Sequence, residues 1–141
     1  MINNTHKDER PSFYAKSRKE WRPWLLKNSK REKNIWLIIY KKESETASIY
    51  YDEAVEEALC FGWIDNKANK RNAESFYLYF AQRNPKSRWS KLNKQRVEEL
   101  VQKGAMTPAG LAMVEEAKSS GTWFALDDVE ALVLPADLEK H

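Results

Sequence analysis

Six consecutive apolar residues, Ile35 to Tyr40, are the feature that most limits how this chain can fold. The run mixes β-branched and aromatic side chains and is followed by Lys41 and Lys42, a pattern typical of a β-strand. Because both alternating sets of side chains are apolar, the strand is expected to be covered on both faces. The rest of the chain must therefore supply strands and helices that pack around it.

A helix is predicted just before this strand. Ser17 followed by Glu20 fits a capping box, in which side chains satisfy two backbone N–H groups at a helix start. Apolar residues of the stretch 21–25 then recur at helical spacing. Pro23 costs a helix interior about 3 kcal/mol, so a start nearer Lys19 or Glu20 is the alternative.

The remaining elements follow from periodicity and from turn residues. A helix over 52–61 is ended by Gly62, and strands over 63–65 and 75–80 then form an antiparallel hairpin, joined by a wide loop that includes a turn-like 67–72. A helix runs from Trp89 or Ser90 to Lys103, and the next helix is begun by Thr107 and Pro108 and ends near Gly121. A short helix is predicted from Asp127 or Asp128 to Leu132. Together they predict an α+β fold, with a small antiparallel sheet of about three strands packed against four to five helices.

One domain is predicted, over residues 17–134, between a flexible N-terminal tail (1–16) and a C-terminal tail (135–141). A chain of 141 residues has the usual size of a single domain and buries about two thirds of its unfolded surface. The residues expected to be largely buried are Trp21, Trp36, Leu59, Phe61, Trp63 and Leu100.

Cysteine usage and the absence of long apolar runs bear on the compartment. Cys60 is the only cysteine, so no intramolecular disulfide can form. The polar first ten residues have no apolar core of a secretory signal, and no run approaches the length of a spanning helix. We therefore expect a cytoplasmic protein without a membrane span; the oligomeric state is not indicated.

The net charge of +3 hides four blocks of alternating sign. Residues 1–42 carry a net +8, residues 43–66 a net −7, residues 67–96 a net +8 and residues 97–141 a net −6. The blocks could pair with each other as solvated surface. Alternatively, the two positive blocks could form one basic face that meets an anion.

No catalytic, cofactor or metal site is predicted. One cysteine and two histidines near the termini do not make a zinc site or a catalytic triad, and four glycines make no phosphate loop. Cys60 falls at a predicted helix C-terminus, where a thiolate is disfavoured, and is read as a core residue. Asp65 is either an exposed strand residue or a lone carboxylate that binds a polar ligand or acts as a base.

The segment from Arg83 to Lys94 is the densest candidate for binding. It places several cations and a tryptophan at a helix N-terminus, whose free N–H groups favour anions and whose aromatic ring could stack on a base. A capped helix start with solvated cations is the alternative. The predicted binding residues are Trp63, Asp65, Arg83, Lys86, Ser87, Arg88, Trp89 and Asn93.

Several stretches together resemble one family. They are Glu20–Leu25 with Asn28, Tyr51–Asp65 and Pro85–Lys94, with Ile35–Tyr40 between them and Met106–Leu111 after them. Over about residues 17–125 the chain resembles the YdeI/OmpD-associated family, also called bacteriocin-protection proteins. The resemblance implies a small α+β domain that protects against bacteriocins or cationic peptides and associates with an outer-membrane porin. The basic residues Lys67, Lys70 and Arg71 depart from the family pattern after Asp65.

Three functions therefore remain open. The first is a non-enzymatic stress or protection protein with an anion-accepting basic surface, or with a peptide or protein partner. The second is a nucleic-acid-binding module that uses both positive blocks. The third is an enzyme with a pocket near Asp65 and the 83–93 segment.

Overall fold

The computed structural model describes residues 10–126, which contain four strands and four helices. They form two compact units. The sheet unit comprises residues up to 58 together with 63–82, and the helical unit comprises 59–62 together with the residues from 83 onward. The α+β fold that the sequence predicted is confirmed. The single domain predicted over 17–134 stays a prediction. The short helix predicted over 127–132 lies outside the described residues.

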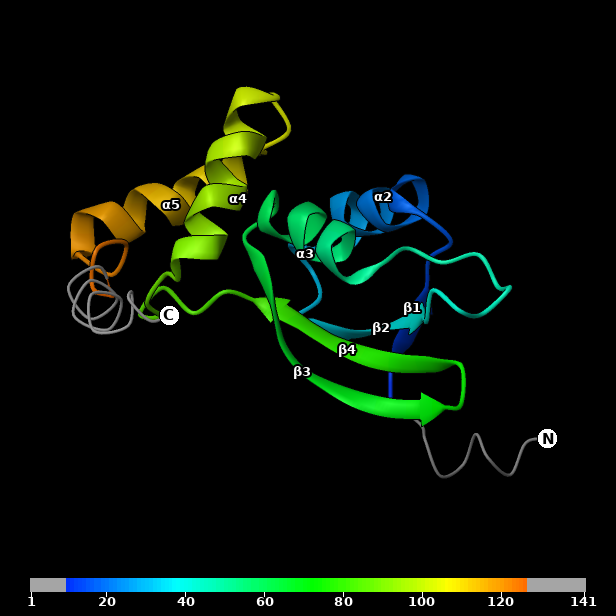
Figure 1. The fold of residues 1–141 in the computed structure, drawn as a ribbon. Helices are drawn as coiled ribbons and strands as arrows, with labels where there is room; N and C mark the ends of the chain where they lie inside the picture. Colours follow the sequence, from blue (N-terminus) through cyan, green and yellow to red (C-terminus); the bar gives the residue numbers. More distant parts are fainter. Residues whose placement is uncertain (1–9, 127–141) are drawn as a thin grey trace. The chain divides into compact units, whose positions relative to one another are not determined.

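The sheet unit contains a mixed four-stranded sheet, in the order β1-β2-β4-β3 (Figure 1). Strand β2 (Asn34–Tyr40) lies inside the sheet, antiparallel to β4 (Ser75–Gln82) and parallel to β1 (Ser12–Tyr14). Strand β3 (Trp63–Asn72) pairs with the other edge of β4. The apolar run at 35–40 is thus a strand, as predicted.

Three features of the sheet differ from the prediction. The sheet is mixed and not antiparallel, because Ser12–Tyr14, predicted as tail, forms the parallel strand β1. The segment 67–72, predicted as a turn, continues β3, which pairs with β4 across two irregular positions. The hairpin therefore turns at 73–74, without a wide loop. Pairing with β4 outweighs the low β-propensity of the Lys and Asn residues in this segment.

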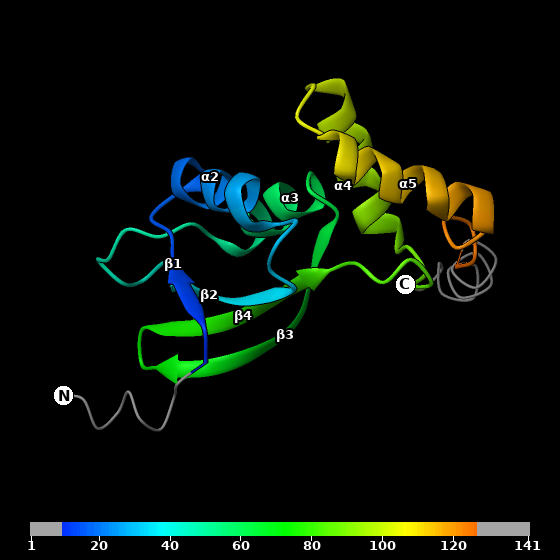
Figure 2. The same cartoon turned by 180° about the vertical axis from the view of Figure 1, so that it is seen from behind.

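Helices α2 (Arg18–Asn28) and α3 (Tyr51–Leu59) lie on one face of the sheet (Figures 1 and 2). Two tryptophans fix this layer. The Nε1–H of Trp21 donates to the Ala54 carbonyl at 3.0 Å, and that of Trp63 donates to the Ser29 carbonyl at 3.1 Å. Both rings are buried, with each indole N–H paired, which is the condition for burying this side chain at low cost.

The start of α2 is the predicted one. Ser17 is the N-cap and accepts from the Lys19 N–H, so the alternative start near Lys19 or Glu20 is wrong. Glu20 reaches back to the N–H of Lys16, one residue before the cap. Pro23 is consequently the sixth residue of the helix and not part of its first turn.

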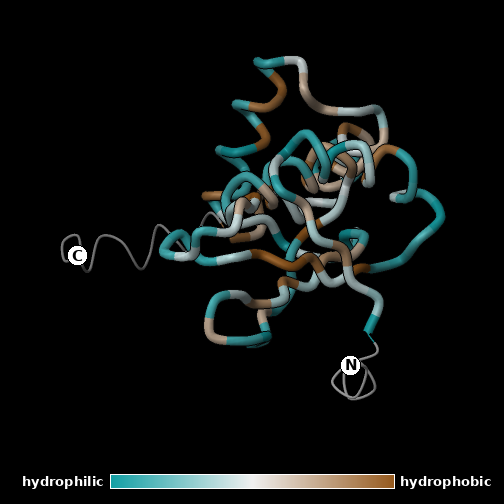
Figure 3. Tube along the Cα trace, turned by 90° about the vertical axis from the view of Figure 1, so that its right-hand side faces the viewer, coloured by the Kyte–Doolittle hydropathy of each residue, from teal (hydrophilic) through white to brown (hydrophobic). Residues whose placement is uncertain are grey.

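The helical unit contains α4 (Lys91–Gln102) and α5 (Pro108–Ser120). Ser90 caps α4. Thr107 caps α5 with Pro108 at its start, as predicted. Along the helices, apolar positions alternate with polar ones (Figure 3), which is the pattern of helices that bury one side. No helix in the described part of the chain is long and apolar enough to cross a membrane.

Five of the six residues predicted to be buried are buried, and Trp36 is the exception. Cys60 is fully buried, as predicted for a core residue. Its carbonyl accepts both the N–H and the hydroxyl of Thr107, and the backbone of Gly110 lies against the same carbonyl. This contact leaves no room for a side chain at residue 110.

Replacing Gly110 by Ala tests this packing. Helix propensity alone would raise the free energy of unfolding by up to about 1 kcal/mol. The added methyl group would collide with backbone atoms of Leu59 and Cys60, so we expect a loss of about 1–3 kcal/mol instead. Urea unfolding measures whether the free energy of unfolding rises or falls. Ala112→Gly at an exposed position of α5 is the control, with an expected loss of about 1 kcal/mol from propensity; a stabilised Gly110→Ala protein would contradict the packing.

Candidate functional site

The face of the sheet opposite α2 and α3, here called the outer face, is rich in aromatic residues. Side chains alternate between the two faces of a strand, and residues paired in register share a face. Ile35, Leu37 and Ile39 point toward the helices, so Trp36 and Tyr40 lie on the outer face. The aromatic residues of the outer face are Tyr14, Trp36, Tyr40, Tyr77 and Tyr79.

These rings form two groups. Trp36 lies opposite Tyr79, with ring centroids 4.8 Å apart, and 6.0 Å from the ring of Tyr77. Tyr14 and Tyr40 meet edge to face at 5.4 Å. Tyr77 is buried, whereas the other four rings are half-buried, so parts of their surfaces face solvent.

Three cations lie over the rings. Arg10 lies 4.5 Å from the Trp36 centroid and 4.2 Å from that of Tyr77. Lys67 lies 5.7 Å from Trp36 and 5.5 Å from Tyr79. Arg71 lies 5.9 Å from Tyr40 and 6.0 Å from Tyr77. Each of these distances is within the range of a cation–π contact.

Lys67 and Arg71 have no carboxylate within ion-pair distance among residues 10–126. Arg71 instead donates to the hydroxyls of Tyr40 and Ser75, at 3.3 and 3.1 Å. Both side chains come from the exposed half of β3, at the two irregular positions of its pairing with β4, and lie beside the rings. The outer face therefore presents positive charge that internal ion pairs do not neutralise.

Two of the predicted binding residues, Trp63 and Asp65, belong to the sheet unit. Trp63 is 1% exposed and packs in the core. Asp65 is half-buried and accepts a hydrogen bond from the Tyr51 hydroxyl at 2.7 Å. The pairing of residue 65 with Phe80 places Asp65 on the helix-covered side of the sheet, away from the outer face.

The other six belong to the helical unit, where Arg83 turns inward. Its guanidinium carbon lies 3.8 Å from the centroid of the Trp89 ring, and its Nη2 donates to the Arg88 carbonyl at 2.9 Å. Both Arg83 and Trp89 are buried, and burial lowers the pKa of the Arg83 guanidinium to about 10. Arg83 Nε is the one buried side-chain nitrogen or oxygen without a hydrogen bond in the described residues.

The remaining four predicted residues lie on or before the first turn of α4. Lys86 and Arg88 are exposed, and Ser87 is half-buried. Ser90 is the N-cap of α4 and accepts from the N–H of Asn93. The Asn93 side chain accepts from Arg96 at 2.7 Å. Of the six predicted residues in this segment, only Lys86 and Arg88 are exposed.

The sequence predicted none of the outer-face rings as binding residues. A signal was present, because Tyr77 and Tyr79 are two residues apart and Trp36 and Tyr40 are four apart. Such even spacing puts side chains on the same face of a strand. The interpretation of the run 35–40 as covered on both faces hid this signal.

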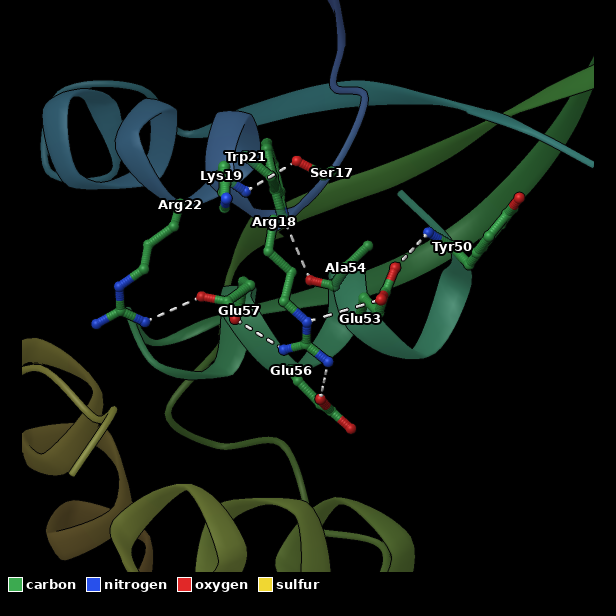
Figure 4. Close-up of polar contacts among 10 residues, drawn as sticks. All are labelled: Ser17, Arg18, Lys19, Trp21, Arg22, Tyr50, Glu53, Ala54, Glu56 and Glu57. Atoms are coloured by element: carbon green, nitrogen blue, oxygen red, sulfur yellow. Dashed lines mark hydrogen bonds and ion pairs between the residues drawn. The ribbon is translucent and has the colours of Figure 1, made fainter. Parts of the chain in front are cut away.

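A cluster of carboxylates on α3 is the other concentration of titratable groups in the sheet unit (Figure 4). Glu57 is buried, and its oxygens accept from Arg18 at 2.8 Å and from Arg22 at 3.0 Å. Arg18 also pairs with Glu56 at 2.6 Å and with Glu53 at 3.8 Å. Because both Glu57 oxygens are held by cations, the cluster ties α2 to α3 and is not arranged as a general base.

Neither the surface depressions nor the possible metal ligands among the described residues make a better candidate binding site than the outer face. A depression of about 500 Å³ in the sheet unit is lined mostly by polar residues of the loops at 41–46 and 73–74, and by none of the predicted binding residues. Among the described residues, no group of three or more His, Cys, Asp or Glu side chains could hold a metal ion. The outer face is therefore the arrangement that binding chemistry fits best.

Fold and site together define a small α+β protein with an aromatic and basic sheet face. A family model described as a domain of unknown function, DUF8412, matches residues 13–113. The match covers well over half of the sequence, so the chain belongs to the DUF8412 family. No curated protein and no solved structure matches the chain. The resemblance to YdeI/OmpD-associated proteins stays a prediction, because the matching family carries no described function.

Replacing Glu57 by Gln tests the structural role of the α3 cluster. The change removes the charge that Arg18 and Arg22 share, at a carboxylate whose side chain is only 8% exposed. We expect the free energy of unfolding to fall by about 1.5–3 kcal/mol, as for other charged hydrogen bonds. Glu53→Gln, at a 41% exposed partner 3.8 Å from Arg18, should cost less than about 1 kcal/mol. If denaturant titrations gave the same loss of free energy of unfolding for both variants, burial of Glu57 would add nothing to the strength of its ion pairs.

Proposed function

We propose that the sheet unit binds single-stranded nucleic acid on its outer face. The observation that carries this proposal is the overlay of Arg10, Lys67 and Arg71 on the rings of one open sheet face. Proteins that bind single strands combine ring faces, on which bases stack, with cations that follow the phosphates. Exposed sheets with aromatic side chains are a known support for such stacking.

Stacking of a base on an outer-face ring is more favourable than the cation–π contact that it replaces. A cation over an exposed ring contributes about 0.5–1 kcal/mol, whereas a base stacked on the ring contributes about 1–3 kcal/mol. A base can therefore displace Lys67 from Trp36, and the displaced ammonium group becomes available to a phosphate. The rings thus bind the bases of the ligand, and the cations bind its phosphates.

The distribution of charge also supports a polyanion. Arg10 comes from the first positive block of the sequence, and Lys67 and Arg71 come from the second. A nucleic-acid binder must bring these blocks to one face, and the outer face draws on both. A protein that captures cationic peptides would expose carboxylates there instead, so the outer face does not support that function.

The basic segment at the start of α4 remains a second candidate for anions. Lys86 and Arg88 are exposed beside the N-terminus of a twelve-residue helix. Ser90 already caps this helix, and Trp89 is buried, so the segment offers charge without a free ring face. The segment therefore lacks the ring surface on which a base would stack, and the outer face is the better candidate.

Salt-dependent binding of a labelled oligothymidylate tests the proposal. With three cations engaged, the plot of log affinity against log salt should have a slope of about −2. Lys67→Ala/Arg71→Ala should bring the slope to about −0.7 and weaken binding at low salt. Fluorescence anisotropy at several salt concentrations measures both.

The matched control is Lys86→Ala/Arg88→Ala, which removes the same charge from exposed positions of the helical unit. Its slope and affinity should stay near those of the wild type. If the control variant loses binding while Lys67→Ala/Arg71→Ala keeps it, the site is the basic segment. If the wild type binds no oligonucleotide at low salt, the nucleic-acid function is wrong.

A further inference from the structure

The rings of the outer face are divided by a covered centre. Trp36 and Tyr79 form one end with Lys67 above them, and Tyr14 and Tyr40 form the other end with Arg71 above Tyr40. Between the ends lie Ile38, which is 9% exposed, and Tyr77, which is 7% exposed. A base can reach ring surface at either end but not at the centre.

The spacing of the two ends sets the length of a ligand. Trp36 and Tyr40 are four residues apart on β2, and a strand rises about 3.3 Å per residue, so the ends are about 13 Å apart. A fully stacked single strand advances about 3.4 Å per nucleotide, so the first and last bases of four nucleotides are about 10 Å apart, which is short of this distance. An unstacked strand extends further, so three nucleotides in an extended strand, or four in a partly stacked one, reach both ends.

We propose that the outer face holds a stretch of three to four nucleotides along β2, with its first and last bases stacked on the two ring groups. This inference rests on the proposed function and adds the length and the mode of recognition. The middle of the ligand contacts the protein through its sugar–phosphate backbone, beside Arg10 over the covered Tyr77 ring. Recognition is therefore bipartite, with base contacts at the ends and charge in the middle.

An oligothymidylate length series tests the footprint on the wild-type protein. Affinity should rise by about 5- to 150-fold when the ligand becomes long enough to stack a second base, at three to four nucleotides. From four to eight nucleotides it should rise less than about threefold, as expected from added binding registers alone. A continued steep rise up to eight nucleotides would overturn the footprint but leave the proposed function standing.

Abasic substitution separates the ends from the middle. Within a four-nucleotide ligand, an abasic site at either end should lower affinity by about 5- to 150-fold, and one at an internal position by less than about threefold. Equal losses at all four positions would overturn the bipartite mode. No binding of any length would overturn both this inference and the proposed function.

Variants at each end supply the matched comparison. Tyr40→Leu should abolish the difference in affinity between two and four nucleotides, and so should Trp36→Leu. Lys103→Ala, at an exposed position of the helical unit outside the basic segment, should leave the whole series unchanged. If a leucine variant does not fold, as judged by thermal unfolding, the wild-type length series and the abasic series still decide the outcome.

Discussion

The register between β2 and β4 is the constraint on which the rest of the sheet unit depends. It sets Leu37 opposite Leu78 on the helix-covered face and Trp36 opposite Tyr79 on the outer face. A slip of one residue would exchange the two faces of β2, which would put Trp36 and Tyr40 under the helices and leave Leu37 in water. Burial of the aliphatic set thus fixes where the aromatic set is displayed.

The helix layer makes this register stable. Trp21 spans the space between α2 and the sheet, stacks against Trp24, and donates its indole N–H to the Ala54 carbonyl of α3. The buried Glu57 then holds two arginines of α2. These contacts use the acidic block against the first basic block, so part of the charge alternation in the sequence is internal pairing. Lys67 and Arg71 on the outer face have no such carboxylate partner among residues 10–126.

Local signals predicted much of the fold. Ser17, Ser90 and Thr107 cap helices because short hydroxyl side chains next to a helix start satisfy free N–H groups, and this depends only on neighbours in sequence. The strands at 35–40 and 75–80 are long apolar runs. By contrast, β1 has three residues and exists through pairing with β2, a non-local contact that no local pattern in Ser12–Tyr14 reveals.

The site was harder to predict than the fold. A dense cationic segment draws attention to Arg83 and Trp89, yet these two side chains stack on each other and are buried. Lys67 and Arg71, by contrast, are exposed on the outer face, because the polar stretch after Asp65 continues as a strand at the sheet edge. Which cations reach a ligand depends on strand pairing, and the composition of the segments does not contain that information.

Photochemical cross-linking tests the central claim, that bases stack on the outer face of the sheet. A four-nucleotide ligand with 5-iodouridine at one end is irradiated with the wild-type protein, and the adduct is located by mass spectrometry. Adducts are expected on Trp36 or Tyr79, or on Tyr14 or Tyr40, according to which end of the ligand lies over which ring group. Adducts confined to the helical unit, with none on the outer-face rings, would contradict stacking on the outer face.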